Sequence, residues 1–321
     1  MKKITALLVS ASLLQACVPG ETPAPVHDAG NVTTAAVEMG TDYQWLVYFD
    51  LKTNTVVERK LRPSWDLAFE AAPDGYHVLL NNAKIMAAYR TGRTDLSAAV
   101  ADDTAGRLKR DSPTGSLDST AVGDWRTGNP VYIIDRGSDG SGSLGLMKVQ
   151  VLSADDHQYS VRFSAMNGSN EHEVTIPKDD NYNFIFLSLT DGSLVSVEPP
   201  KADWDIVFTP YTHIYYDMDN LPYTVTGCLL NHYNTAAAKD TTHDFTAITY
   251  DNISGYTFST DINTIGFDWK TYSFTTSTYT TDVKKNYIIR DSEGIYYKLH
   301  FIDFLNASGE KGNPKWEYQR L

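Results

Sequence analysis

The sequence predicts a mostly all-β protein, made of two related antiparallel β units with few or no helices. Its 20 Tyr residues, together with many Thr and Val residues, favour strands over helices. Polar turns containing Gly recur between short apolar runs, as expected of hairpins. One strand pattern also occurs twice, as WDLAF at residues 65–69 and WDIVF at residues 204–208, which indicates a duplication.

The duplication rests on five landmarks that recur in the same order. The matching pairs are the hairpin-like runs at 48–57 and 186–195, Trp65 and Trp204, Trp125 and Trp269, residues 132–134 and 287–289, and residues 146–149 and 296–299. A chain of 321 residues is long enough for two ordinary domains. We therefore predict a degenerate first unit at residues 41–180 and a better-preserved second unit at residues 181–321.

The N-terminal residues have the features of an export signal. Lys2 and Lys3 precede an apolar run at residues 4–14, which has the length of a signal peptide and is too short for a membrane-spanning helix. The run ends in LLQAC, which resembles a bacterial lipobox, so we predict a signal peptide at 1–17 and lipidation of Cys17. An ordinary signal peptide with a chance cysteine is the alternative.

The residues after Cys17 predict a tether and a destination. Residues 18–40 contain Pro, Gly, Thr and Ala with almost no large apolar side chains, which is typical of a flexible linker. Val18, rather than Asp, follows the cysteine, and this agrees with the general sorting pattern for the outer membrane of a Gram-negative cell.

Composition and motifs argue against several functions. The net charge of −13 and the lack of a basic cluster argue against nucleic-acid binding. Only Cys17 and Cys228 are present, which excludes a disulfide framework, and Cys228 is predicted to be a buried strand residue. The sequence shows no nucleophile elbow, phosphate-binding loop, zinc-protease motif or dinucleotide fingerprint. We predict a binding protein and not an enzyme.

Two segments of the first unit allow more than one interpretation. Residues 135–142 (DRGSDGSG) have oxygen-bearing side chains at alternate positions, like a calcium loop. The second unit has only DSEG at 291–294 between the corresponding strands, so a hairpin turn is the better interpretation. Residues 98–108 are compatible with a short helix or a surface loop.

Four features together resemble the HmuY family of Bacteroidetes-type haem-binding lipoproteins. They are the Trp-Asp strand, the YII strand at 287–289 with its turn, the YKLHF strand at 297–301, and the lipobox. The resemblance covers nearly all of the second unit and, more loosely, the first. The best-known members are about one unit long, so this chain resembles a two-unit relative. The resemblance implies an almost all-β fold, surface exposure and the capture of haem.

The resemblance also implies side chains that bind the iron of haem b. Haem iron is held by one or two donors such as His, Met, Tyr or Cys. The best-studied member uses two histidines; the first corresponds to His243, and the second falls near residues 274–275, where this chain has none. The candidates for a second ligand are His213, His232, Met218, Tyr272 and Tyr279. Each histidine could instead be a solvent-facing or hydrogen-bonded loop residue.

The predicted function is that of a hemophore-like, lipid-anchored protein of the outer membrane. It would bind haem at the cell surface and pass it to an outer-membrane uptake system such as a TonB-dependent receptor, as the resemblance implies. The alternative is a non-catalytic adhesion or scaffolding β-module that binds protein or glycan. The missing second histidine and the degenerate first unit favour this alternative.

Overall fold

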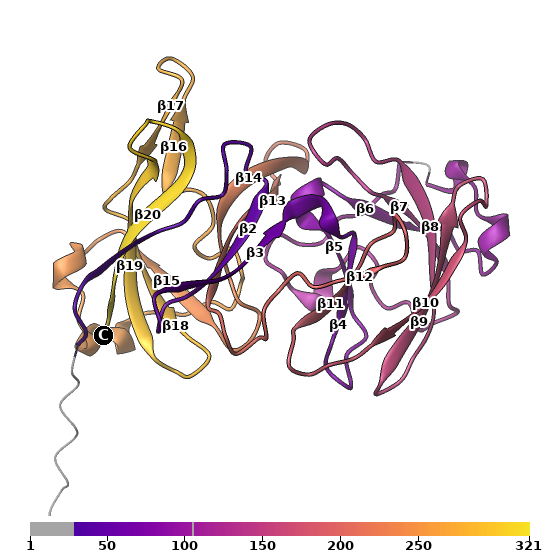
Figure 1. Ribbon diagram of the computed structural model, residues 1–321, viewed down its shortest axis with the longest axis horizontal. Helices are drawn as coiled ribbons and strands as arrows, with labels where there is room; N and C mark the ends of the chain where they lie inside the picture. The colour runs from indigo at the N-terminus through magenta and orange to yellow at the C-terminus, as the bar shows by residue number, and fades with distance from the viewer. Residues whose placement is uncertain (1–28, 105) are drawn as a thin grey trace, which may run out of the picture.

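The computed structural model describes residues 29–104 and 106–321, which form strands joined by turns and short 3₁₀ helices (Figure 1). The strands are β1 (Thr33–Ala36), β2 (Trp45–Asp50), β3 (Thr55–Leu61), β4 (Leu67–Glu70), β5 (Val78–Leu80), β6 (Ala87–Arg90), β7 (Val131–Asp135), β8 (Leu146–Ala154), β9 (Gln158–Ala165), β10 (His172–Pro177), β11 (Phe184–Leu187), β12 (Leu194–Val195), β13 (Ile206–Tyr215), β14 (Leu221–Leu230), β15 (Ala236–Asp240), β16 (Lys270–Ser273), β17 (Thr278–Thr281), β18 (Asn286–Arg290), β19 (Tyr296–Leu305) and β20 (Lys311–Arg320). The 3₁₀ helices are η1 (Arg62–Ser64), η2 (Asn82–Lys84), η3 (Leu96–Ala98), η4 (Ala101–Asp103), η5 (Leu117–Ser119), η6 (Phe245–Ala247) and η7 (Tyr250–Gly255). The mostly all-β prediction is confirmed.

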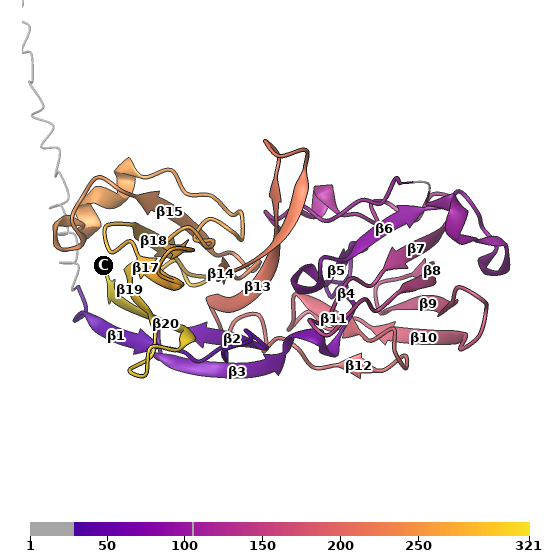
Figure 2. The same ribbon diagram turned by 90° about the horizontal axis from the view of Figure 1, so that it is seen from above.

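The sheets form four layers. Two four-stranded sheets, in the orders β12-β11-β4-β5 and β14-β13-β2-β3, lie in the middle. Each is covered on its outer side by a five-stranded sheet, in the order β10-β9-β8-β7-β6 on one side and β1-β20-β19-β18-β15 on the other (Figure 2). Strands β16 and β17 form a separate two-stranded hairpin.

The central strands are apolar throughout because both of their faces are buried. In β13, Ile206 and Phe208 pack into the core shared with the outer sheet, whereas Val207 faces the core between the two central sheets. Strand β4 repeats this arrangement, with Phe69 facing its outer sheet and Ala68 facing the other central sheet. Successive side chains of a strand point to opposite faces, so a sheet buried on both sides needs an unbroken apolar run. This explains the duplicated WD-apolar pattern.

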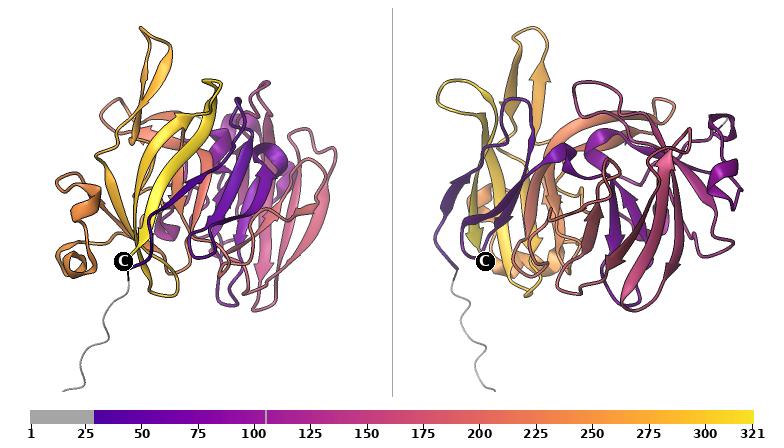
Figure 3. Two further views of the ribbon diagram at one scale, coloured as in Figure 1. Left: turned by 60° about the vertical axis from the view of Figure 1, so that its left-hand side comes forward. Right: turned by 45° about the vertical axis from the view of Figure 1, so that its right-hand side comes forward.

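The N-terminal strands complete the sandwich that the C-terminal strands begin. Strands β4 to β12 form one pair of sheets, the first sandwich. Strands β13 to β15 and β18 to β20, together with β1 to β3, form the other pair, the second sandwich. Strand β2 pairs with β13, and β1 pairs with β20. Figure 3 shows the indigo N-terminal segment beside the yellow C-terminal strands. The second hairpin, β11–β12, pairs with β4 in the same way. Strand pairing thus crosses the predicted boundary between residues 180 and 181, and the division into two units stays a prediction.

Part of the segment predicted as a linker belongs to the fold. Strand β1 lies within residues 18–40 and pairs with β20 from Thr33 to Ala36. Val37 and Met39, which follow it, are buried in the core of the same sandwich. Alternating buried and exposed side chains mark this short stretch as an edge strand, a pattern that its low content of large apolar residues concealed.

The Trp-Asp pair that recurs in the sequence forms a hydrogen bond to a hairpin in each sandwich. Asp66 accepts a hydrogen bond from the backbone N–H of Leu189 at 2.7 Å, and Asp205 accepts one from Leu51 at 2.8 Å. Each leucine lies just after the strand of the hairpin that pairs with the Trp-Asp strand. Both carboxylates are buried. The Trp-Asp motif therefore has a structural role: its carboxylate holds the turn of the neighbouring hairpin.

A buried asparagine in each sandwich forms hydrogen bonds to the backbone of the Trp-Asp pair. The Asn81 side chain donates to the backbone carbonyl of Trp65 at 3.0 Å, and Asn231 donates to that of Trp204 at 2.7 Å. The backbone N–H of each asparagine donates to the carbonyl of the following aspartate, Asp66 or Asp205. Both asparagines are fully buried and end the neighbouring strand. The two sandwiches thus share these asparagine hydrogen bonds as well as those of the Trp-Asp pair.

Three smaller expectations can be compared with the structure. Asp135 ends β7, and residues 136–142 lie in the connection to its antiparallel partner β8, so the hairpin-turn interpretation is confirmed. In the described part of segment 98–108, Ala98 ends the 3₁₀ helix η3, and Ala101–Asp103 form the short 3₁₀ helix η4. Cys228 is fully buried in β14, as predicted. No helix in residues 29–104 and 106–321 is long and apolar enough to cross a membrane, and Cys17 lies outside the described residues.

Candidate functional site

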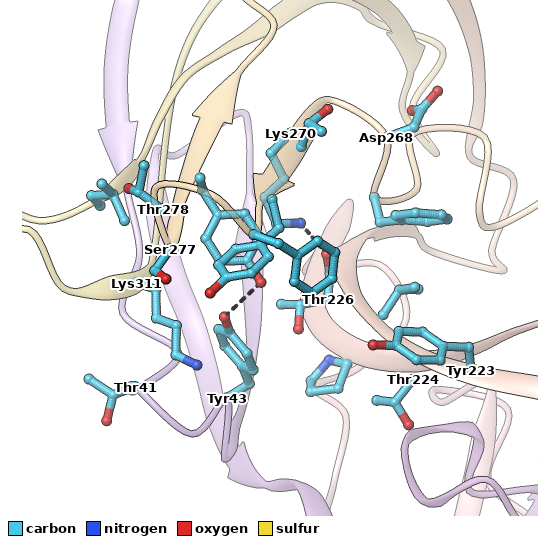
Figure 4. A pocket seen from close by; sticks show the side chains of 18 of the residues that line it. Thr41, Tyr43, Tyr223, Thr224, Thr226, Asp268, Lys270, Ser277, Thr278 and Lys311 are labelled. Atoms are coloured by element: carbon cyan, nitrogen blue, oxygen red, sulfur yellow. Dashed lines mark hydrogen bonds between the residues drawn. The ribbon is translucent and has the colours of Figure 1, made fainter.

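A cleft of about 1000 Å³ lies between two projecting hairpins of the second sandwich (Figure 4). One wall is the far end of the β13–β14 hairpin, and the other is the β16–β17 hairpin. Further surface comes from Thr41 and Tyr43, from Phe267 and Asp268, and from the turn between β19 and β20. The cleft is thus formed by segments from both ends of the chain.

The β13–β14 wall projects because its strands outrun their sheet. Both strands have ten residues, but β13 pairs with β2 only from Ile206 to Phe208. The rest of the hairpin is a two-stranded ribbon that extends to Tyr215 (Figure 2). Tyr215 and Tyr223 line the cleft from this ribbon, with ring centroids 6.3 Å apart. Tyr223 is 57% exposed, so its ring is available to a ligand.

The β16–β17 wall carries an aromatic cluster. Tyr272 and Tyr279 are directly opposite in the strand register, with ring centroids 5.0 Å apart. Phe274, at the turn, is 88% exposed and lies 5.1 Å from Tyr272. A two-stranded hairpin is barely stable by itself, and cross-strand aromatic pairs are the contacts that stabilise it. An exposed Phe beside these rings presents apolar surface to the cleft.

The lining of the cleft combines tyrosine hydroxyls with lysine amines. The Tyr43 hydroxyl donates to the Tyr279 hydroxyl at 3.3 Å, and burial raises the pKa of Tyr43. The Lys311 amine lies 4.9 Å from the centroid of the Tyr43 ring. Lys270 also lines the cleft, with its amine 4.3 Å from the centroid of Trp269. Such a surface suits a flat aromatic ligand that carries negative charge.

The structure does not bring the four residues predicted from the sequence into one site. His243 follows β15 at the surface, with 54% of its side chain exposed and its Nδ1 2.7 Å from Asp240. His232 follows the opposite end of β14, where its ring makes an edge contact with Phe184 at 5.1 Å. Burial lowers the pKa of His232 to about 4. Met218 is exposed in the turn between β13 and β14.

Among the predicted histidines, His213 is the one within strand β13, which forms part of a cleft wall. Its ring packs against Tyr215 and Phe267, two residues that line the cleft, at 4.7 and 5.0 Å between centroids. Its buried Nδ1 atom has no hydrogen-bond partner among the described residues. Burial lowers the pKa of His213, which favours the neutral ring. The roles of His243, His213, His232 and Met218 as ligands stay predictions.

Other residues of the cleft were missed by the sequence analysis. Tyr272 and Tyr279, predicted as second ligands, do line it, but Tyr43, Tyr223 and Lys270 were not considered. The alternation of Tyr211, His213 and Tyr215 and the richness of residues 270–281 in Tyr and Thr were the available signals. The described residues contain no group of three or more His, Cys, Asp or Glu side chains that could hold a metal ion.

The chain is thus an all-β protein of paired sandwiches, with an aromatic cleft between two hairpins. The family model described as "HmuY protein" matches residues 42–318. The chain belongs to the HmuY family. The single match spans both predicted units.

Several solved structures are similar to the chain at low sequence identity. PinO from Porphyromonas gingivitis has 10% identity and a TM-score of 0.31, covering 91% of this chain and 97% of its own. The HmuY analog TFO from Tannerella forsythia has 12% identity and a TM-score of 0.26, covering 92% and 98%. An HmuY-like protein from Bacteroides vulgatus has 14% identity and a TM-score of 0.23, covering 89% and 90%. A search of curated proteins found no significant match.

Proposed function

We propose that the protein binds haem b in the cleft between the β13–β14 and β16–β17 hairpins. The observation that carries this proposal is the pair of aromatic walls, with Tyr215 and Tyr223 on one side and Tyr272 and Phe274 on the other. A porphyrin is a flat aromatic ring with acidic substituents, and the volume of about 1000 Å³ is at the upper end for small-molecule sites. Family membership supports the same ligand.

The residues of the cleft offer oxygen donors to the haem iron. Tyr272 and Tyr279 both line it, and tyrosine is an established axial ligand of haem iron. When bound, haem would supply the chromophore and the iron; the protein would hold the ring and exclude water from its faces. We propose Tyr272 and Tyr279 as the first candidates for the donor.

His243 is the competing donor. Its Nδ1 atom contacts the Asp240 carboxylate, which leaves Nε2 as the ring nitrogen for a second partner. A carboxylate on one nitrogen is the usual arrangement for a metal-binding imidazole. Nevertheless, His243 is not among the residues that line the cleft.

The test is a titration of the full-length chain with hemin, followed in the visible spectrum. Any shortened version must retain β1, because this strand pairs with β20. A saturable Soret change that is weakened by Tyr272→Ala supports the cleft. Tyr279→Phe and Tyr272→Phe remove only hydroxyl groups, so a spectral change in either assigns the donor. Loss of binding in His243→Ala alone would assign the iron to His243 and refute the cleft.

Delivery and location form the remaining part of the proposal. We infer that a lipid on Cys17 anchors the protein to the outer membrane, with the sandwiches at the cell surface. The haem would pass to an outer-membrane uptake system such as a TonB-dependent receptor, without catalysis. Radiolabelled palmitate incorporation in Cys17→Ser, compared with the unchanged chain, tests the anchor. If no hemin binding is found, the alternative of an adhesion or scaffolding module for protein or glycan is favoured.

A further inference from the structure

Lys270 is a buried cation at the base of the cleft. The buried lysines of the described chain are Lys84, Lys148, Lys270 and Lys298. Of these four, Lys270 lines the cleft. Lys84 shows how such a charge is normally accommodated, because its amine lies 2.8 Å from the Asp66 carboxylate. A buried charge is costly unless an opposite charge or several hydrogen bonds compensate for it.

Among the described residues, no carboxylate forms an ion pair with Lys270, and Asp268 favours its charged form only from a greater distance. Its amine donates to the backbone carbonyl of Thr226 and lies against the rings of Trp269 and Phe304, at 4.3 and 4.7 Å from their centroids. Within the described residues, no carboxylate oxygen lies within 4.0 Å of the Lys270 amine. The neighbouring Asp268 is paired with Lys239 at 2.9 Å and Lys285 at 3.3 Å.

The electrostatic consequence is a site that attracts an anion. Burial lowers the pKa of Lys270 to about 7. A carboxylate entering the cleft would supply the missing counter-charge and favour the protonated amine. Surrounding aromatic rings lower the local dielectric constant, which strengthens a charge-assisted hydrogen bond. Figure 4 shows the Lys270 nitrogen among the side chains that line the cleft.

We propose that Lys270 recognises a carboxylate of the ligand and so sets how the ligand lies in the cleft. The inference rests on the proposed function, since the propionates of haem are such carboxylates. Because both propionates project from one edge of the porphyrin, an ion pair with Lys270 would turn that edge towards the base of the cleft. The specificity then extends to porphyrins with free acids and disfavours their neutral esters.

The test compares hemin with hemin dimethyl ester, in which the propionates are uncharged. The full-length chain is titrated with each, as are Lys270→Met, Lys270→Arg and Lys239→Met. Methionine keeps an apolar stem against Trp269 and Phe304 while removing the charge. Lys239 is the matched control, because it pairs with Asp268 but does not line the cleft. Circular dichroism melting verifies that each variant is folded.

The unchanged chain is expected to bind hemin at least about tenfold more tightly than the ester, the size expected of a hydrogen bond between charged groups. Lys270→Met should bind both with equal affinity, whereas Lys270→Arg and Lys239→Met should retain the preference. Equal affinities in the unchanged chain, or a preference that persists in Lys270→Met, would overturn the role of Lys270 and leave haem binding intact. If neither porphyrin binds, the proposed function fails as well.

Discussion

Replacing Asp205 with asparagine should stabilise the protein at alkaline pH and have little effect in mild acid. Burial raises the pKa of Asp205 from 3.8 to about 7, and the hydrogen bond from Leu51 offsets only part of this rise. The carboxyl is therefore easier to protonate in the folded than in the unfolded chain. Its contribution to stability is complete below about pH 4 and is lost as the pH rises through about 7.

The expected size follows from the two pKa values. One pKa unit corresponds to about 1.4 kcal/mol, so a rise from 3.8 to about 7 reduces the free energy of unfolding by about 4 kcal/mol once Asp205 is ionised. Asparagine carries no charge, and its side-chain oxygen can still accept the Leu51 N–H. The stability difference between Asp205→Asn and the unchanged chain should grow from pH 4 to pH 7 and reach about 4 kcal/mol at pH 8.

Urea unfolding followed by tryptophan fluorescence at pH 4 to 8 measures this difference. Asp66→Asn is the matched control, because Asp66 occupies the same position in the other copy but contacts Lys84 and Arg136 at 2.8 and 2.9 Å. Removing its charge leaves Lys84 and Arg136 without their carboxylate partner. The free energy of unfolding should fall by about 3–5 kcal/mol. The reasoning is refuted if Asp205→Asn and the unchanged chain have the same pH dependence.

Three further predictions concern the N-terminal segment that completes the second sandwich, the cleft, and the turn after β7. Met39→Ala should lower the free energy of unfolding by about 2–5 kcal/mol, because Met39 is fully buried, whereas exposed Glu38→Ala should have little effect in the same urea experiment. Tyr272→Ala should weaken hemin binding, and Tyr216→Ala, on an exposed residue that does not line the cleft, should not; equal effects in the titration would argue against the cleft. Gly137→Ala should lower the melting temperature, since Gly137 has φ +67° and a Cβ there would lie 1.8 Å from a backbone oxygen of η2; an unchanged melting curve would contradict this.

The sequence predicts where the strands lie better than it predicts which strands pair with each other. The apolar runs at residues 48–57 and 204–208 identify strands because local composition is sufficient for that purpose. Which strands pair depends on contacts far apart in the chain, such as Thr33 with Tyr318. Burial on both faces also removes the alternation that would show which side of a strand faces which core. The completion of the second sandwich by β1 to β3 could therefore not be read from the pattern.

The site was partly predictable for a similar reason. Tyr272 and Tyr279 stand out because their segment is rich in Tyr and Thr, and the structure places both in the cleft. Tyr43 enters from the other end of the chain, so no spacing rule connects it with Tyr279. Lys270 is also not recognisable in advance, because a single lysine gives no sign of burial. The predicted histidines lie far apart in the structure. The resemblance located His243 only by its distance from Trp269 along the chain, and such a distance does not show which side chains surround it.

The cleft described above belongs to the second sandwich, whose β16–β17 hairpin lies outside the four layers. Both sandwiches contain the Trp-Asp strand, the buried asparagine and the paired hairpin. Hydrogen bonds of the aspartate and the asparagine connect these elements within each sandwich. The β16–β17 hairpin belongs to the second sandwich alone among the described sheets, and it contacts the scaffold mainly through β19. A hairpin outside the layers is able to change its side chains without disturbing either core. We therefore expect ligand preference to be determined by this hairpin and the β13–β14 ribbon, while the duplicated core residues determine stability.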